Sequence, residues 1–176
     1  MGALARRLAL AGLVALAVGG ATSYLQSVLP YGVASLANSA GPWCLVAYGL
    51  SWRSRRVGEG ALTGAMALGL LVAGYYLVAH LRGFGVSATS VTFWCAAAVT
   101  VGPVLGGAAV IARRGRGWLS VVAALVLPVL LIGEGLRSLA QIADSTSSAY
   151  WIGEIVVGVV LVLPAVAILR RTRSVR

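Results

Sequence analysis

Residues 118–140 read WLSVVAALVLPVLLIGEGLRSLA, and only Glu134 and Arg137 in this stretch are charged. An apolar run of about 20 residues is long enough to cross the roughly 30 Å hydrocarbon core of a bilayer as a helix. Similar runs fill the chain of 176 residues, of which 60% are hydrophobic and 10% charged. A soluble domain could not keep so much apolar surface from water. The sequence therefore predicts an all-α polytopic membrane protein.

Six such runs predict six transmembrane helices in a single domain covering residues 1–176. They are expected at about 8–29, 33–52, 61–81, 91–112, 118–140 and 150–169. Long runs rich in small residues are typical of helices, because the strands of a membrane barrel alternate over about ten residues. The first run also resembles a secretory signal peptide, but it exceeds the usual apolar core in length, so we expect it to be retained.

The arginines predict the orientation of the chain. All 14 basic residues are arginines, and positive charge concentrates in the cytoplasmic segments of membrane proteins. If both termini are cytoplasmic, every arginine except Arg82 and Arg137 lies inside. We therefore expect a bacterial plasma-membrane protein with both termini in the cytoplasm. The net charge of +10 lacks the interleaved aromatic stripe of a nucleic-acid interface, so no nucleic-acid partner is expected.

Two of the four acidic residues fall within the outer half of predicted spans. At 1.5 Å per residue, Glu134 and Glu154 lie at nearly the same depth, about 5–6 Å below the outer edge of the hydrocarbon. An ionisable side chain there is costly unless it is paired or faces a cavity, so it indicates a functional site. Simpler interpretations are a local ion pair between Glu134 and Arg137, and a Glu154 that reaches the interface.

We expect these groups to line an outward-facing cavity together with further polar and aromatic side chains. Trp43, Tyr75 and Tyr76 lie deeper than an interfacial aromatic belt and are candidates for stacking on a ligand. Asn38 lies near the start of the second span, and His80 ends the third. The predicted ligand-binding residues are Glu134, Arg137, Glu154, Asn38, Trp43, Tyr75, Tyr76 and His80.

No sequence pattern indicates a metal or an organic cofactor. Nucleotide-binding, zinc-protease and nucleophile-elbow motifs are all missing from the sequence. Cys44 and Cys95 lie in apolar runs without the spacing of metal ligands. We therefore expect neither a metal nor a cofactor.

Small residues and prolines predict how the helices pack. Gly60-x-x-x-Gly64 and Gly102-x-x-x-Gly106 have the spacing that lets two helices approach closely, and we expect them to pack within the chain. Pro42, Pro103 and Pro164 are equally spaced. A helix hairpin repeated three times would explain that spacing, as would coincidence between spans of uniform length.

Six helices, both termini inside and a small-residue first helix resemble the substrate-capture (S) components of energy-coupling-factor vitamin transporters. The resemblance implies that Ala11 and Ala15 face a partner transporter. It also implies that Glu134, Arg137, Glu154 and Trp43 line a site near the outer face. Residues 38–43 (NSAGPW) and 74–76 (GYY) are similar to those of poorly characterised six-helix actinobacterial membrane proteins, and this likeness implies no activity.

Three functions remain open. The first is binding of a small molecule in the outward-facing cavity, as in a solute-capture subunit. The second is an integral-membrane enzyme acting on an isoprenoid lipid, in which Glu134 or Glu154 supplies the acid of a terpene-cyclase-like reaction. The third is an accessory membrane protein whose acidic residues only pair with arginines. No sequence pattern identifies the ligand or the oligomeric state.

Overall fold

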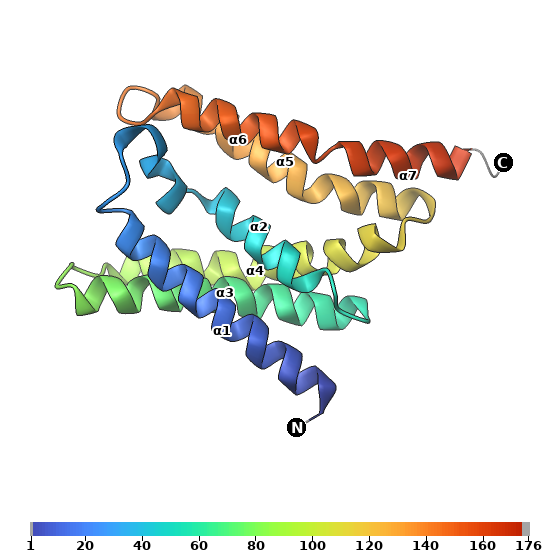
Figure 1. Cartoon of the computed structure of the whole chain (residues 1–176), viewed down its shortest axis with the longest axis horizontal. Helices are drawn as coiled ribbons and strands as arrows, with labels where there is room; N and C mark the ends of the chain where they lie inside the picture. The colour runs from blue at the N-terminus through green and yellow to red at the C-terminus, as the bar shows by residue number, and fades with distance from the viewer. Residues whose placement is uncertain (1, 174–176) are drawn as a thin grey trace.

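The structure is a computed structural model that describes residues 2–173, and the regular structure within them is entirely helical. Figure 1 shows the elements, which in chain order are α1 (Ala3–Leu25), the 3-10 helix η1 (Tyr31–Ala37), α2 (Ala40–Ser51), α3 (Val57–Leu81), α4 (Ala88–Arg114), α5 (Gly117–Gln141), α6 (Ser148–Val160) and α7 (Leu163–Arg173). The predicted all-α fold is confirmed. Five helical stretches of the described residues are long and apolar enough to cross a membrane: Leu4–Leu25, Val57–Leu81, Ala88–Arg114, Gly117–Gln141 and Ser148–Thr172.

The predicted span 33–52 is not one continuous helix. η1 ends at Ala37, and α2 begins only at Ala40. The Ser39 side chain caps α2 by accepting a hydrogen bond from the Gly41 amide at 3.2 Å. Pro42 then lies in the first helical turn, where its missing N–H removes no helical hydrogen bond. The expectation of an unbroken helix was wrong because this local pattern starts a new helix within the span.

The first helix begins and ends earlier than the predicted span 8–29. α1 ends at Leu25 rather than Leu29. Leu29 precedes Pro30, and a residue before proline is pushed away from helical backbone angles. The chain instead forms a short turn in which the Leu29 amide donates to the Leu25 carbonyl at 2.9 Å.

The prolines have different structural roles. Pro164 cannot donate to the Val160 carbonyl, and the last predicted span (150–169) is interrupted at residues 161–162 between α6 and α7. Pro103 lies inside the continuous helix α4. Pro42 and Pro164 both lie in the first turn of a helix that follows a break, α2 and α7 respectively, so Pro103 differs from the other two. The equal spacing of the prolines therefore does not mark an equivalent position in three hairpins.

The α3–α4 pair is packed through its glycines, as the spacing predicted. A Cβ atom on Gly64 would meet the Gly102 carbonyl oxygen, and one on Gly106 would meet the Gly60 carbonyl oxygen. These two helices therefore touch backbone to backbone, which only glycine permits at such separations. The prediction that these glycines pack within the chain is confirmed.

α1 packs on α3 in the same manner. A Cβ on Gly74 would meet the Leu16 carbonyl oxygen of α1. Ala15 is fully buried and Ala11 is 7% exposed. The expectation that Ala11 and Ala15 present a face to a partner transporter was therefore wrong. Their small side chains serve close packing inside the molecule, which a small-residue pattern alone cannot distinguish from a partner interface.

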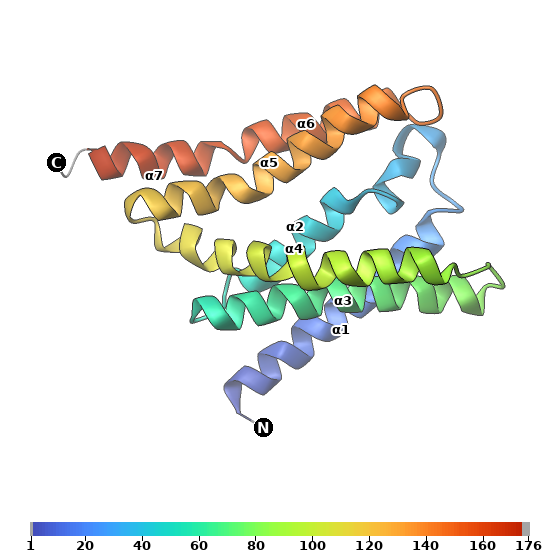
Figure 2. The ribbon, with the colours of Figure 1, turned by 180° about the vertical axis from the view of Figure 1, so that it is seen from behind.

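α2 lies between two groups of helices. Figures 1 and 2 show α3 and α4 side by side, with α5, α6 and α7 forming a second group and α2 between the two. α2 contacts α3, α4 and α5, and the core at this junction contains the fully buried side chains Ala47, Leu71, Leu105 and Leu131. The start of α2 is therefore held inside the helical bundle.

Candidate functional site

The start of α2 binds a carboxylate from α5. The Ala40 amide donates to Glu134 Oε1 at 2.8 Å, and the Ser39 hydroxyl donates to the same oxygen at 3.0 Å. The first amides of a helix have no partners within the helix, and its N-terminus carries a partial positive charge. The break before α2 thus creates a polar site to which a carboxylate is suited.

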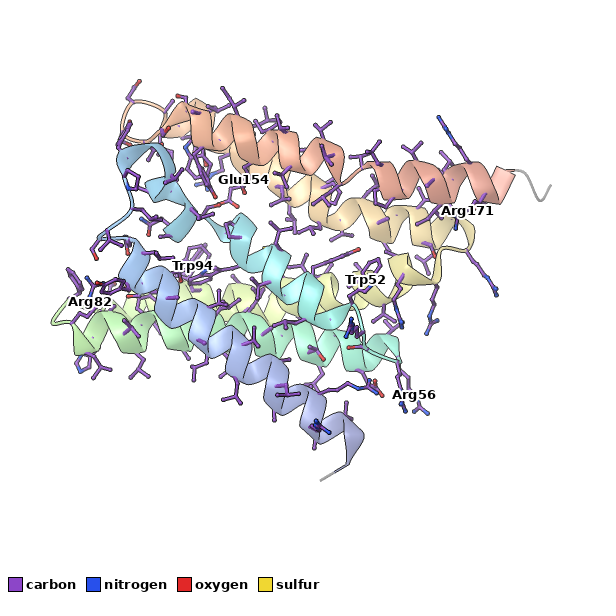
Figure 3. All side chains as sticks on the ribbon, viewed as in Figure 1. Trp52, Arg56, Arg82, Trp94, Glu154 and Arg171 are labelled. Atoms are coloured by element: carbon purple, nitrogen blue, oxygen red, sulfur yellow. The ribbon has the colours of Figure 1, made fainter. Side chains whose placement is uncertain are left out.

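Glu154 of α6 reaches the same serine. Ser39 Oγ lies 3.3 Å from both Glu154 carboxyl oxygens. Glu154 is only 8% exposed and Ser39 3%, and in Figure 3 Glu154 points from α6 toward the start of α2. A hydroxyl group has a single proton, so Ser39 donates to one carboxylate at a time and accepts from the other group when that group is protonated. We call Glu134 and Glu154 the carboxyl pair.

Gly41 makes room for this arrangement. A Cβ atom at position 41 would meet Glu154 Oε1 and would lie 2.8 Å from Leu131 Cδ2. The Glu154 carboxyl group therefore lies directly against the backbone of the first turn of α2. Any larger residue at position 41 would push it away from Ser39.

A cavity of about 510 Å³ adjoins Glu134. α2, α3, α4 and α5 contribute its walls, which are mainly aliphatic and aromatic. Trp94 packs edge-on against Trp43 at a centroid distance of 5.9 Å and against Phe93 at 5.2 Å. Glu134 and Arg137 supply the charged groups of the lining. We call this space the carboxylate cavity.

Trp43 has a polar atom without a partner. The residue is 8% exposed, and its Nε1 is buried without a hydrogen bond to any of the described residues. Burying an N–H group unpaired is costly, and such groups in proteins nearly always find a partner. Trp43 lines the carboxylate cavity and also a smaller cavity of about 70 Å³. An acceptor atom of a bound molecule would supply the missing partner.

The predicted site residues separate into groups. Glu134, Trp43 and Arg137 line the carboxylate cavity, whereas Glu154 lines a separate cavity of about 430 Å³ formed by η1, α2, α5 and α6, so the two carboxyl groups do not share one cavity as expected. Within residues 2–173 Arg137 is exposed and forms no ion pair with Glu134. The interpretation of Glu134 and Arg137 as a local ion pair is therefore wrong.

Three further predicted residues line the smaller cavity, to which Trp43 also contributes. They are Asn38, Tyr75 and Tyr76, and the Tyr75 ring contacts Trp43 at 5.7 Å between centroids. His80 is exposed in the last turn of α3, and its imidazole makes no hydrogen bond to the described residues. The structure does not bring His80 to the carboxyl pair.

Sequence reasoning did not identify Ser39, the Ala40 amide or Gly41 as site components. Their signal was present, because serine followed by glycine and proline at residues 39–42 is a helix-start pattern. This helix-start pattern was not recognised because it lies inside an apolar run that was interpreted as one continuous helix. Among the described residues, no group of three or more histidine, cysteine, aspartate or glutamate side chains is arranged to hold a metal ion.

Comparison with known proteins gives one match. The sequence model of a family of unknown function (DUF6518) matches residues 2–176. No curated protein and no solved structure matches the chain. The match covers almost the whole sequence and assigns no activity.

Proposed function

Because the chain belongs to a family of unknown function (DUF6518), we propose from its site that the protein binds a small amphipathic molecule in the carboxylate cavity. One observation carries this proposal: the carboxyl pair meets at the start of α2 beside an aromatic cavity of about 510 Å³. Small-molecule sites typically measure about 300–1,000 Å³ and combine apolar walls with a few polar groups. The unpartnered Trp43 Nε1 supports the proposal independently.

The lining indicates the chemistry of the ligand. An apolar body would pack against Trp43, Trp94 and Phe93. A cationic group or hydrogen-bond donor would face Glu134, because carboxylates and aromatic faces both attract cations. An acceptor atom on the ligand would take the hydrogen bond of Trp43 Nε1. A hydrophobic amine that also carries a hydroxyl or carbonyl oxygen meets all three conditions.

The proposal includes six membrane crossings. Five are the long apolar stretches, and the sixth consists of η1 and α2 in series, each too short to cross alone. Arg56 and Arg171 lie at one end of the molecule and Arg82 at the other (Figure 3). The positive-inside rule assigns the arginine-rich end to the cytoplasm of a bacterial cell, so both termini are cytoplasmic. The carboxylate cavity then belongs to the outer half of the membrane.

Reporter fusions test this topology. Alkaline phosphatase fused after Gly85, between α3 and α4, is expected to be active, because that enzyme works only outside the cytoplasm. Green fluorescent protein fused after Gly115, between α4 and α5, or at the C-terminus is expected to fluoresce inside the cell. An active phosphatase at the C-terminus would contradict the proposed orientation.

Ligand binding is tested with amines and their neutral analogues. Alicyclic and aromatic amines are expected to raise the melting temperature of the purified protein more than the alcohols of the same skeleton. Glu134→Gln is expected to weaken amine binding about tenfold or more, because it removes the charge that faces the amine. The matched control is Glu59→Gln at the start of α3, where Glu59 accepts a hydrogen bond from the Arg55 amide. Equal amine binding by wild type and Glu134→Gln would refute the assignment.

The carboxyl pair also favours a second candidate function. An acid beside aromatic faces is what cyclisation of an isoprenoid requires, since the acid protonates the substrate and the rings stabilise the cation. Gas chromatography with mass spectrometry would detect a cyclised product from prenyl substrates. Wild type would form it, and Glu134→Gln and Glu154→Gln would not. A substrate panel recovered unchanged would leave ligand binding as the function.

A role as a solute-capture subunit of a transporter rests on the architectural resemblance alone. The comparisons do not connect the chain to those components, and the Ala11/Ala15 face that would meet the transporter is covered by α3. Such a subunit would need a different docking surface. An accessory role without a small ligand would be favoured if the wild-type protein bound none of the amines.

A further inference from the structure

A second cavity, of about 420 Å³, lies where α1 and α3 end and α4 begins. Its lining is rich in polar groups and includes Ser27, Tyr75, Arg82, Ser87 and Ser90. Neither member of the carboxyl pair lines it. Arg82 is labelled in Figure 3 at this end of the molecule, opposite Arg56 and Arg171. We call this space the arginine cavity.

Arg82 is held in a fixed orientation. Its Nη1 donates to the Ser23 carbonyl at 2.8 Å, and its Nη2 donates to Ser27 Oγ at 2.6 Å. The guanidinium carbon lies 5.0 Å from the ring centroids of both Tyr24 and Phe84. These contacts use two of the five N–H groups, so three remain for a ligand. Within the described residues no aspartate or glutamate pairs with Arg82, and its positive charge is not neutralised locally.

The local sequence produces this arrangement. Gly83 has φ +80°, a left-handed conformation that suits glycine and ends α3. The Gly83 amide donates to the His80 carbonyl at 2.9 Å, and the Phe84 amide donates to the Ala79 carbonyl at 3.0 Å. This pair of hydrogen bonds is a Schellman motif. It turns the chain back so that Phe84 covers the Arg82 guanidinium.

The start of α4 faces the same space. Ser87 caps this helix by accepting a hydrogen bond from the Ser90 amide at 3.4 Å, and both serines line the arginine cavity. A helix N-terminus favours negative charge, and the serine hydroxyls add hydrogen-bond donors. The fixed, unneutralised Arg82 and the start of α4 therefore both favour an anion in this cavity.

We propose that the arginine cavity binds a phosphate group through the Arg82 guanidinium and the Ser87 and Ser90 hydroxyls. A planar guanidinium with several free N–H groups matches the oxygens of a phosphate. The phosphate of a membrane lipid and free inorganic phosphate share this chemistry. Exposed apolar side chains nearby, namely Tyr24, Leu81 and Phe84, suit the acyl chains of a lipid. This inference is independent of the proposed ligand in the carboxylate cavity.

Three probes added to the full-length protein in neutral detergent test the proposal by native mass spectrometry and thermal unfolding. They are dihexanoyl phosphatidylglycerol, inorganic phosphate, and dihexanoylglycerol, which lacks the phosphate. Wild type is expected to bind the phospholipid and not the phosphate-free lipid. Arg82→Gln is expected to bind the phospholipid about tenfold more weakly or worse. Arg114→Gln removes the same charge from an exposed arginine at the end of α4 and is expected to bind like wild type.

The binding of the three probes distinguishes a lipid site from a site for free phosphate. Binding of the phospholipid but not inorganic phosphate identifies a lipid headgroup site, and comparable binding of both identifies a site for free phosphate. If Arg82→Gln fails to fold, Arg82→Lys keeps the charge but loses the planar fork, and it is expected to bind phosphate less tightly than wild type. The proposal is overturned if wild type binds neither phosphate-bearing probe, or if a folded Arg82 variant and wild type bind them equally.

Discussion

Alanine in place of Gly64 is expected to lower the free energy of unfolding by about 1–3 kcal/mol, the usual cost of overpacking. The added Cβ would lie 3.0 Å or less from the Gly106 backbone and would also meet the Gly102 carbonyl oxygen. Backbone atoms cannot rotate away as a side-chain tip can, so α3 and α4 would have to separate. Denaturation with increasing fractions of sodium dodecyl sulfate in mixed micelles, followed by circular dichroism, measures this loss.

Gly69→Ala is the matched control on the same helix. A Cβ atom at position 69 would meet nothing within 4 Å. Alanine lowers the backbone entropy of the unfolded chain, so this variant is expected to be more stable than wild type by about 0.5–1 kcal/mol. The two substitutions are chemically identical and are expected to act in opposite directions. Equal effects at both positions would refute the close backbone packing of α3 and α4.

Gly41→Ala is expected to disrupt the carboxyl pair and to weaken amine binding in the carboxylate cavity about tenfold or more. The new Cβ would occupy the place of Glu154 Oε1, so that carboxyl group would leave Ser39. The new Cβ would also lie 2.8 Å from Leu131 Cδ2, so this side chain would have to shift as well. Melting-temperature shifts with the amine and alcohol probes measure the loss of binding.

Gly49→Ala tests whether any alanine in α2 has the same effect. A Cβ at position 49 would meet nothing within 4 Å, and the residue lies near the end of the same helix. This variant is expected to bind amines like wild type. If Gly41→Ala also bound them like wild type, with its fold intact by circular dichroism, the contact of Glu154 with Ser39 would not be required for ligand binding.

The sequence predicted those elements of the fold that apolar length encodes. α3, α4 and α5 lie where unbroken apolar runs were found, because a continuous run of that length has no better structure in a membrane than a helix. Glu134 and Glu154 both contact Ser39, and their matching positions along the last two apolar runs had predicted that they lie close together. In both cases the spacing of residues along the sequence is enough to predict the structure: the length of an apolar run predicts a helix, and the position of a glutamate within its run predicts its neighbour.

The features that depend on a distant partner were not predicted. The break at Ser39 is tolerated inside the bundle because Glu134, from another helix, accepts the Ala40 amide. An apolar run contains no information about that acceptor. The packing partner of α1 could not be predicted for the same reason. Ala11 and Ala15 indicate that another helix approaches closely, but their spacing does not identify that helix.

The first turn of α2 is expected to reach its native structure late in the synthesis of the chain. The first turn of α2 depends on an acceptor that belongs to α5, which lies far later in the chain. Residues 40–51 are synthesised before Glu134, so the Ala40 amide lacks its native partner at that stage. We therefore expect the native start of α2 to form only after α5 has been synthesised, so that the carboxyl pair is completed late in biogenesis.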